Sequence, residues 1–271
     1  MPAPYKTLLI EKDGAVDHVT FNRPEALNTL NNQMVDDLLD YFGGLYFDRT
    51  TRIVVLKGAG RAFCAGLDIK ENQTAQPGDN AKRGPSAGLL SQRRISEIVI
   101  RMRRCQQAII SLVHGPACGG GFAIALASDI RIAGESARMN AAFIRIGLSA
   151  CDIGVSYFLP RLVGVSVASE LMLTGRFINA ERALRVGLVS EVVPDADLDK
   201  AAKVYLDEML TTSPMGLRLT KECLNMSVDA QSLEAAIAME DRNQILCAQS
   251  EDVREGMMAF LEKRPPNYSG N

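Results

Sequence analysis

Three consecutive glycines stand where a predicted strand meets a predicted helix, and their backbone N–H groups could bind a negatively charged oxygen. Residues 113–122 read VHGPACGGGF. The apolar run 108–112 predicts a buried strand, and the small residues 123–127 predict a helix. Glycines at a helix N-terminus leave N–H groups free, with the positive end of the helix dipole behind them. The pattern indicates an anion site; a tight turn without a ligand is the alternative.

A second predicted strand ends in a similar loop of small residues. Residues 53–58 (IVVLKG) form an apolar run, and residues 60–69 (GRAFCAGLDI) follow it. Two strands that each end in such a loop can bring two backbone N–H groups to one point. An oxyanion hole is built in this way.

Together the two stretches resemble the crotonase superfamily, the enoyl-CoA hydratases and isomerases. The resemblance rests on AFCAGLDIK at 62–70 and HGPACGGG at 114–121. Other matching pieces follow in the family's order at 21–24, 27–28, 173–175, 187–189 and 255–264. The resemblance implies an α/β fold, with a spiral of ββα units over residues 1–194. A C-terminal helical region over 195–271 would then build a homo-trimer or a dimer of trimers.

The resemblance also assigns the oxyanion donors and the contacts with coenzyme A. The N–H groups of Leu67 and Gly120 would hold the thioester oxygen of an acyl-CoA, which is the substrate and not a permanently bound cofactor. Gly120 would have to stay small, because a side chain there would enter the thioester site. The residues expected near CoA are Ala62, Cys64, Ala65, Asp68, Ile69, Phe260 and Lys263, the last two reaching the CoA of a neighbouring subunit. The alternatives are a packing role for Phe260, a solvated Lys263, and a loop-pinning or capping role for Asp68.

The two glutamates that hydratases of this family use are missing here. Their positions hold Ala123 and Phe143, neither of which can act as an acid or a base. The resemblance therefore argues against ordinary two-glutamate hydration. The resemblance still implies an enzyme of the hydratase/isomerase type that stabilises a thioester enolate, and it leaves open whether the reaction is hydration with another acid, isomerisation, hydrolysis or decarboxylation. The alternative is a non-catalytic acyl-CoA binding or assembly protein of the same fold.

One acidic residue remains as a candidate for proton transfer. Residues 147–154 (GLSACDIG) resemble the dienoyl-CoA isomerase loop, and residues 156–164 resemble 4-chlorobenzoyl-CoA dehalogenases. Both alignments place Asp152 at the acid, if one extra residue is accepted; without it, Cys151 takes the position. Dehalogenation is disfavoured, because no residue matches the histidine of those enzymes. The alternative for Asp152 is a cap on the helix that begins near Gly154.

Composition excludes several other classes of protein. The 271 residues carry a net charge of −2, so the protein has no overall positive electrostatic field that would attract nucleic acid. No apolar run of 18 residues or basic, apolar leader is present, so we expect a cytoplasmic protein. The six cysteines form no Cys-x-x-Cys pair, and the two histidines are too few for a His-rich metal site. His114 is expected to pin the glycine turn rather than to act in catalysis.

The remaining elements follow from periodicity and turn signals. Asp13-Gly14 predicts a hairpin, apolar spacing predicts a helix over 26–42, and polar residues predict a loop over 71–90. An arginine-rich helix over 91–106 is expected to be a solvated face, with RNA binding as the alternative. Four helices are expected in the C-terminal region, over 195–211, 214–228, 231–248 and 251–262.

Overall fold

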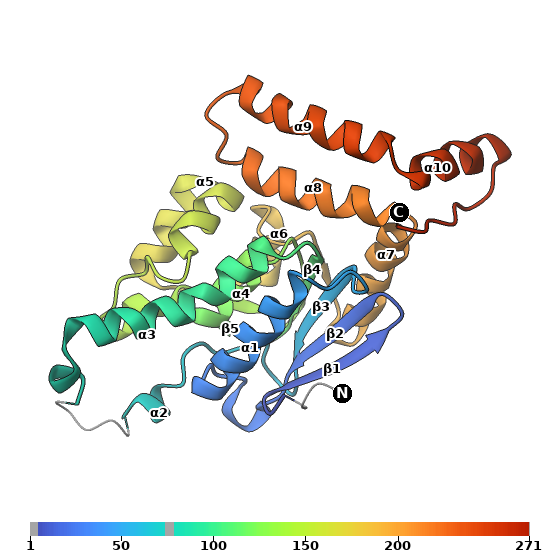
Figure 1. Cartoon of the computed structure of the whole chain (residues 1–271). Helices are drawn as coiled ribbons and strands as arrows, with labels where there is room; N and C mark the ends of the chain where they lie inside the picture. The colour runs from blue at the N-terminus through green and yellow to red at the C-terminus, as the bar shows by residue number, and fades with distance from the viewer. Residues whose placement is uncertain (1–4, 74–78, 271) are drawn as a thin grey trace.

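A six-stranded sheet forms the centre of the computed structural model, which describes residues 5–73 and 79–270 (Figure 1). β1 pairs with β2 in an antiparallel hairpin across Gly14, as the Asp-Gly step predicts, and the other neighbours are parallel. The strands, in their order across the sheet, are β1 (Leu8–Asp13), β2 (Val16–Phe21), β3 (Ile53–Gly58), β4 (Ala108–Val113), β6 (Ile130–Gly134) and β9 (Glu191–Val193).

A smaller sheet lies beside the first, and two of its strands directly follow strands of the large sheet along the chain. It contains β5 (Pro116–Cys118), β7 (Arg138–Asn140) and β8 (Ile178–Asn179). Cys64 adds an isolated bridge to Ala117 of β5. The chain thus passes from β4 to β5 and then into α4 (Gly120–Ala127), and from β6 to β7 before its next long helix. This succession confirms the expected ββα architecture.

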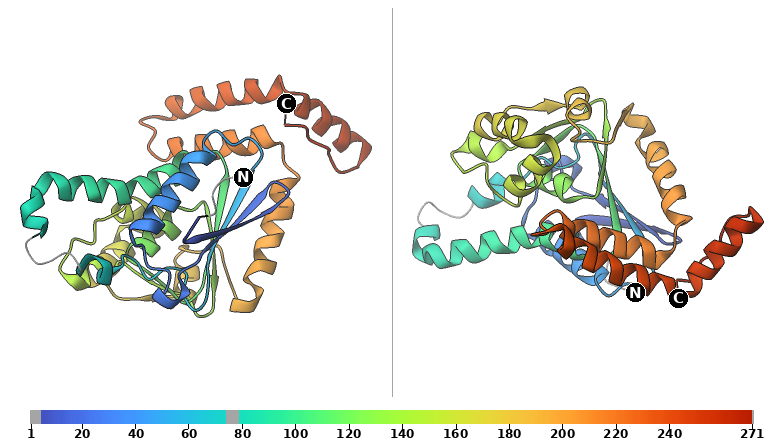
Figure 2. Two further views of the ribbon diagram at one scale, coloured as in Figure 1. Left: turned by 60° about the horizontal axis from the view of Figure 1, so that its bottom comes forward. Right: turned by 90° about the horizontal axis from the view of Figure 1, so that it is seen from above.

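The two faces of the large sheet are covered by different helices, because alternate side chains of a strand point to opposite faces. Ile53 and Val55 pack with α7 (Leu198–Leu210), whereas Val54 and Leu56 belong to the core on the other face. That second core includes buried residues of α1 (Asn32–Leu45), α4 and α5 (Val155–Thr174). Figure 2 shows the sheet between α7 and the other helices.

The prediction of a loop over 71–90 is wrong for residues 71–73 and 79–90. Residues 74–78 lie outside the described residues. α2 (Ile69–Gln73) and α3 (Asp79–Arg104) cover those flanks. Within α3, Gly84 has non-helical angles (φ 70°, ψ 167°), and Pro85 follows it. Proline fits the first turn of a helix, so the Gly-Pro step joins two helical segments instead of forming a loop.

The helix expected over 26–42 begins six residues later. Leu27 and Asn28 adopt left-handed angles (φ 52° and 55°), which end the short 3-10 helix η1 (Pro24–Ala26) and prevent a continuous α-helix. Asn31 then caps α1 by accepting a hydrogen bond from the N–H of Met34 at 2.9 Å.

The four C-terminal helices lie close to their predicted positions. α7 follows the 3-10 helix η3 (Asp195–Asp197), and α8 (Pro214–Ser227), α9 (Leu233–Ala248) and α10 (Glu251–Glu262) follow it. α9 and α10 extend away from the sheets (Figures 1 and 2). The remaining elements are the 3-10 helix η2 (Ala142–Ile146) and α6 (Ala180–Arg185), which Asn179 caps as expected. Within the described residues, no helix has the length and apolar character needed to span a membrane.

Candidate active site

The loop after β3 is held by a short parallel bridge between Leu30 and Leu67. The N–H of Leu30 donates to the Gly66 carbonyl at 2.7 Å, and the N–H of Asp68 donates to the Leu30 carbonyl at 3.0 Å. Because successive peptide groups of an extended segment point in opposite directions, the N–H of Leu67 faces away from Leu30. It is therefore available to a ligand on the other side of the loop.

The glycine turn supplies a second free N–H beside the first. Gly119 has a φ of 50°, and α4 begins at Gly120, whose N–H has no acceptor within the helix. A Cβ atom on Gly66 would stand 3.6 Å from the Gly120 nitrogen and 2.7 Å from the Cys118 carbonyl oxygen. The two loops therefore approach each other closely enough that only glycine fits at position 66.

Both loops line one small cavity of about 110 Å³, to which Leu67 and Gly120 contribute. Its other lining is largely apolar. Asp152 is the only ionisable residue among the described residues that line it. The apolar side chains around it are Ile69, Ile95, Phe143, Ile146 and Leu148. The structure thus brings together the three residues that the sequence singled out for catalysis.

Asp152 reaches this cavity from the loop before α5. Its Oδ1 accepts hydrogen bonds from the Ile153 N–H at 2.8 Å and from Gln92 Nε2 at 2.5 Å. Burial raises the pKa of the Asp152 carboxyl above its ordinary value, and the hydrogen bonds from Ile153 and Gln92 oppose that shift. The N-cap of α5 is Gly154, without a side-chain cap bond, so the side chain of Asp152 is not the helix cap.

Neighbouring residues explain why Asp152 and not Cys151 faces the cavity. Cys151 is exposed, and its N–H donates to Ser149 Oγ at 3.1 Å. Ile153 has a φ of 46° and Gly154 a φ of 81°. These two left-handed residues turn the chain sharply, so Asp152 lines the cavity and Cys151 is directed to solvent.

The two positions that the resemblance assigns to the hydratase glutamates hold buried apolar residues, Ala123 and Phe143. Ala123 is fully buried in α4 and does not line the cavity. Phe143 does line it, and a Cβ on Gly119 would stand 3.4 Å from the Phe143 ring. Phe143 therefore gives this wall of the cavity an aromatic surface.

Only some of the residues expected near CoA line this cavity. Ala65 and Ile69 line the cavity, whereas Ala62 and Cys64 are fully buried. The N–H of Cys64 donates to the Pro116 carbonyl, and its own carbonyl accepts from Cys118. Asp68 pairs with Arg23 at 2.9 Å, in agreement with a loop-pinning role.

Phe260 and Lys263 lie at the far end of the C-terminal region. The Phe260 side chain is 83% exposed, and Lys263 is the left-handed C-cap of α10 (φ 54°). Figures 1 and 2 show α10 away from α2, α3 and α4, which surround the cavity. The structure therefore does not bring these two residues to the cavity of their own chain.

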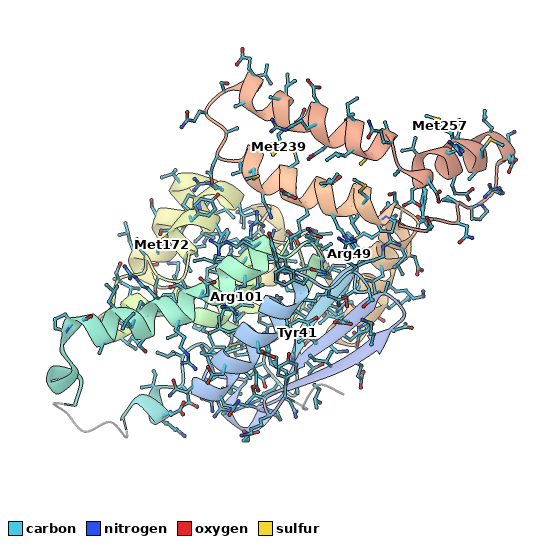
Figure 3. All side chains as sticks on the ribbon, viewed as in Figure 1. Tyr41, Arg49, Arg101, Met172, Met239 and Met257 are labelled. Atoms are coloured by element: carbon cyan, nitrogen blue, oxygen red, sulfur yellow. The ribbon has the colours of Figure 1, made fainter. Side chains whose placement is uncertain are left out.

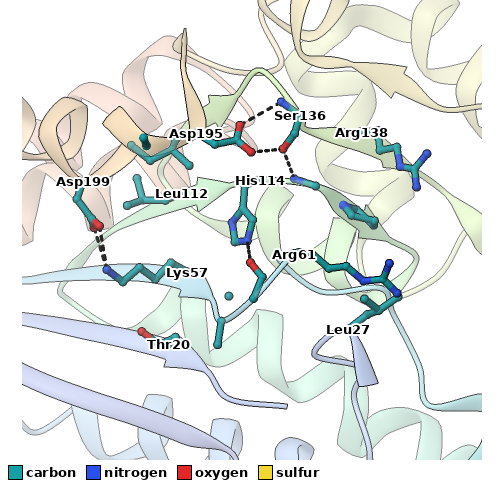
Figure 4. A pocket seen from close by; sticks show the side chains of 17 residues that line it. Thr20, Leu27, Lys57, Arg61, Leu112, His114, Ser136, Arg138, Asp195 and Asp199 are labelled. Atoms are coloured by element: carbon teal, nitrogen blue, oxygen red, sulfur yellow. Dashed lines mark hydrogen bonds and ion pairs between the residues drawn. The ribbon is translucent and has the colours of Figure 1, made fainter. Parts of the chain in front are cut away.

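A larger cavity of about 970 Å³ lies at the carboxyl ends of β2, β3 and β4 (Figure 4). Several of its polar groups are paired with one another. Lys57 contacts Asp199 at 2.9 Å, Ser136 donates to Asp195, and His114 Nε2 lies 2.9 Å from the Gly60 carbonyl oxygen. His114 thus ties the glycine turn to the neighbouring loop, as expected.

The arginines of α3 make contacts within the chain. Arg94 pairs with Asp36, and Arg103 pairs with Asp129 at 3.5 Å. Arg101 contacts Glu97 at 3.2 Å and donates to the Leu39 carbonyl at 2.6 Å. These contacts favour a structural role for this helix over RNA binding.

Sequence reasoning missed Gln92, whose partner lies 60 positions away. The only sequence signal is its helical spacing, since Gln92 precedes Ile95 by three residues and both line the cavity. No local pattern distinguishes it from other polar residues of the helix.

Known proteins are similar to this chain over nearly its whole length. The family model described as enoyl-CoA hydratase/isomerase matches residues 11–271. A Mycobacterium tuberculosis protein named "Probable enoyl-CoA hydratase EchA12" is 39% identical over 94% of this chain and 89% of its own. The 1,2-epoxyphenylacetyl-CoA isomerase of Escherichia coli is 35% identical over 97% and 98%. The solved enoyl-CoA hydratase of Bacillus anthracis superposes with a TM-score of 0.90 at 30% identity, covering 98% and 100%.

Proposed function

The chain belongs to the enoyl-CoA hydratase/isomerase family, and on that premise we propose that it isomerises an unsaturated acyl-CoA thioester. The observation that carries the proposal is the shared cavity of Leu67, Gly120 and Asp152. Two backbone N–H groups that donate to no described residue, together with one carboxyl, are the groups that an enolate mechanism requires.

The two N–H groups hold the thioester oxygen in this mechanism. As a proton leaves the carbon chain, negative charge develops on that oxygen, and both hydrogen bonds strengthen. One preorganised donor of this kind contributes about 2.7–4 kcal/mol to transition-state stabilisation. The lining is mainly apolar, so a bound acyl group would displace water from the cavity and thereby increase the strength of each electrostatic interaction.

Asp152 moves the proton in this mechanism. Its carboxylate removes a proton from a carbon that is acidified by the thioester, and returns it to another carbon of the same conjugated system. Isomerisation needs only this one acid–base group. Hydration would also need a group to activate water, and Ala123 and Phe143 offer none. This difference favours isomerisation over hydration.

A panel of CoA thioesters tests the proposal. Purified protein is given 2-enoyl, 3-enoyl and dienoyl-CoA substrates, and products are separated by mass and retention time. We expect double-bond migration with no gain of water. CoA-thioester binding without turnover on any substrate would contradict the proposal and identify a non-catalytic binding or assembly protein.

We further propose that residues from 195 onward form an assembly region for trimers. α8, α9 and α10 carry exposed apolar side chains, and Figure 3 shows Met257 on α10, far from the sheets. Other large apolar residues exposed there are Leu224, Leu233, Ile245, Leu246 and Phe260. Several large apolar side chains exposed on one helical region are typical of subunit contacts. In such an assembly Phe260 and Lys263 would reach a neighbour's CoA, which light scattering and a Lys263→Ala binding assay would test.

A further inference from the structure

Two donors from different parts of the chain converge on one oxygen of Asp152. The Ile153 N–H comes from the same loop, and Gln92 comes from α3, across the cavity. Both bond to Oδ1, and no described residue makes a hydrogen bond with Oδ2. The two carboxyl oxygens are therefore inequivalent: one is tethered and the other remains available.

The loop alone gives only part of this placement. Ile153 is a β-branched residue with a φ of 46°, which is an unfavourable backbone conformation. Its Cδ1 lies 3.5 Å from the position of a Cβ on Gly120, so its side chain packs at the glycine turn. This packing places Asp152 near the oxyanion donors. Rotation of the carboxyl about its side-chain bonds is limited by the second tether, Gln92.

We propose that Gln92 is a positioning residue that fixes Oδ1 of Asp152 and leaves Oδ2 as the proton-transferring oxygen. The inference rests on the proposed function and extends it to a residue on α3. Since an amide does not titrate, this tether persists over the whole pH range in which Asp152 changes its charge. A hydrogen bond to the carboxylate also favours its charged form and thereby opposes the effect of burial.

Substitution of Gln92 tests the inference through both rate and pH profile. Gln92→Ala and the nearly isosteric Gln92→Glu both remove the amide donor. We expect kcat to fall about tenfold to hundredfold, because a small misplacement of a reacting group has effects of this size, while KM changes little. The acid limb of the kcat profile should move to higher pH. Arg93→Ala, next to Gln92 on the same helix, is the matched control and should behave like wild type.

Two results would overturn the inference. An unchanged kcat in both Gln92 variants would show that the tether has no part in the reaction. A lower kcat with an unmoved acid limb would show a merely structural effect of the helix. Circular dichroism confirms that each variant is folded before the kinetics are compared.

A measurement that needs no substrate turnover distinguishes a failure of this inference from a failure of the proposed function. The Asp152 carboxyl carbon, labelled with ¹³C and assigned by its loss in Asp152→Asn, is titrated by NMR in the resting protein. Gln92→Ala should raise the pKa of this carboxyl relative to wild type, and Arg93→Ala should not. An unmoved titration would contradict the role of Gln92 even if no substrate were found. A raised pKa in a protein that turns over no thioester would support the tether and reject the proposed function.

Discussion

Arg23 and Asp68 form an ion pair at 2.9 Å that joins the turn after β2 to the loop that carries Leu67. Both side chains are mostly buried, and Thr29 Oγ1 also donates to Asp68 at 3.2 Å. Because Asp68 directly follows Leu67, this pair holds in place one of the two backbone N–H groups that we propose as oxyanion donors. The Asp68 Oδ1 additionally accepts from the Lys70 and Glu71 N–H groups at the start of α2.

Asp68→Asn should destabilise the chain in a pH-dependent manner. Burial raises the pKa of Asp68, but the hydrogen bonds from Arg23, Glu71 and Thr29 outweigh it, so the net pKa is lowered. A lowered pKa stabilises the folded state above the carboxyl's unfolded value, and this stability is lost as pH falls through the folded value. We expect urea unfolding near neutral pH to show a loss of about 1.5–3 kcal/mol.

The same measurement in acid provides the check on that prediction. As the pH falls below the usual pKa range of carboxyl groups, wild type should lose its additional free energy of unfolding. The unfolding curves of wild type and Asp68→Asn should then converge. A difference that stayed constant with pH would mean that the charge of Asp68 is not what stabilises the loop.

Gly120→Ala should lose activity, whereas Gly121→Ala should lose stability. A Cβ on Gly121 would stand 2.1 Å from the Cys64 carbonyl oxygen, which is backbone and cannot move aside. We expect a loss of about 1–3 kcal/mol or more, as for overpacked sites. A Cβ on Gly120 would meet the flexible end of Leu30 at 2.8 Å. That variant should stay folded and lose activity, because its methyl group would enter the thioester site. Thermal melts and turnover distinguish the two; equal melting points would contradict the difference.

Local signals in the sequence predicted much of this site, and non-local contacts explain what was missed. The glycines at 66 and 119–121 are recognisable because close backbone approach excludes side chains. The C-terminal helices follow from apolar spacing and caps. α1 begins later than predicted because Leu27 and Asn28 adopt left-handed angles that tertiary contacts impose. The contact of Gln92 with Asp152 spans 60 residues, so no local pattern contains it.

Asn28→Ala should be among the more destabilising single changes near the site. Asn28 is fully buried with a φ of 55°, and its Nδ2 donates to the carbonyls of Ala59 and Ala62 at 2.9 and 2.8 Å. Its Oδ1 accepts from the Arg23 N–H at 2.9 Å. Loss of these bonds leaves buried groups unpaired, and we expect about 2–4 kcal/mol from chemical unfolding. Asn22→Ala is the control, since its side chain makes no hydrogen bond with a described residue; equal effects would contradict the assignment.

The pH dependence of turnover should reflect the environment of Asp152. Because burial raises its pKa, the base form appears only above the range in which an exposed aspartate ionises, at about 3.9. We therefore expect kcat to rise with pH along a limb that lies higher than that value. The control is a substrate-binding titration over the same range, which should not follow this limb. A rate that is independent of pH there would exclude Asp152 as the base.

The most direct test of the account is hydrogen exchange between a bound CoA thioester and deuterated water, compared in wild type and Asp152→Asn. Wild type should exchange carbon-bound hydrogen of the acyl group. The variant, which keeps the size of the side chain, should bind the thioester but exchange about 10²–10⁴-fold more slowly. Exchange at the wild-type rate in Asp152→Asn would contradict proton transfer by Asp152, whatever the overall reaction proves to be.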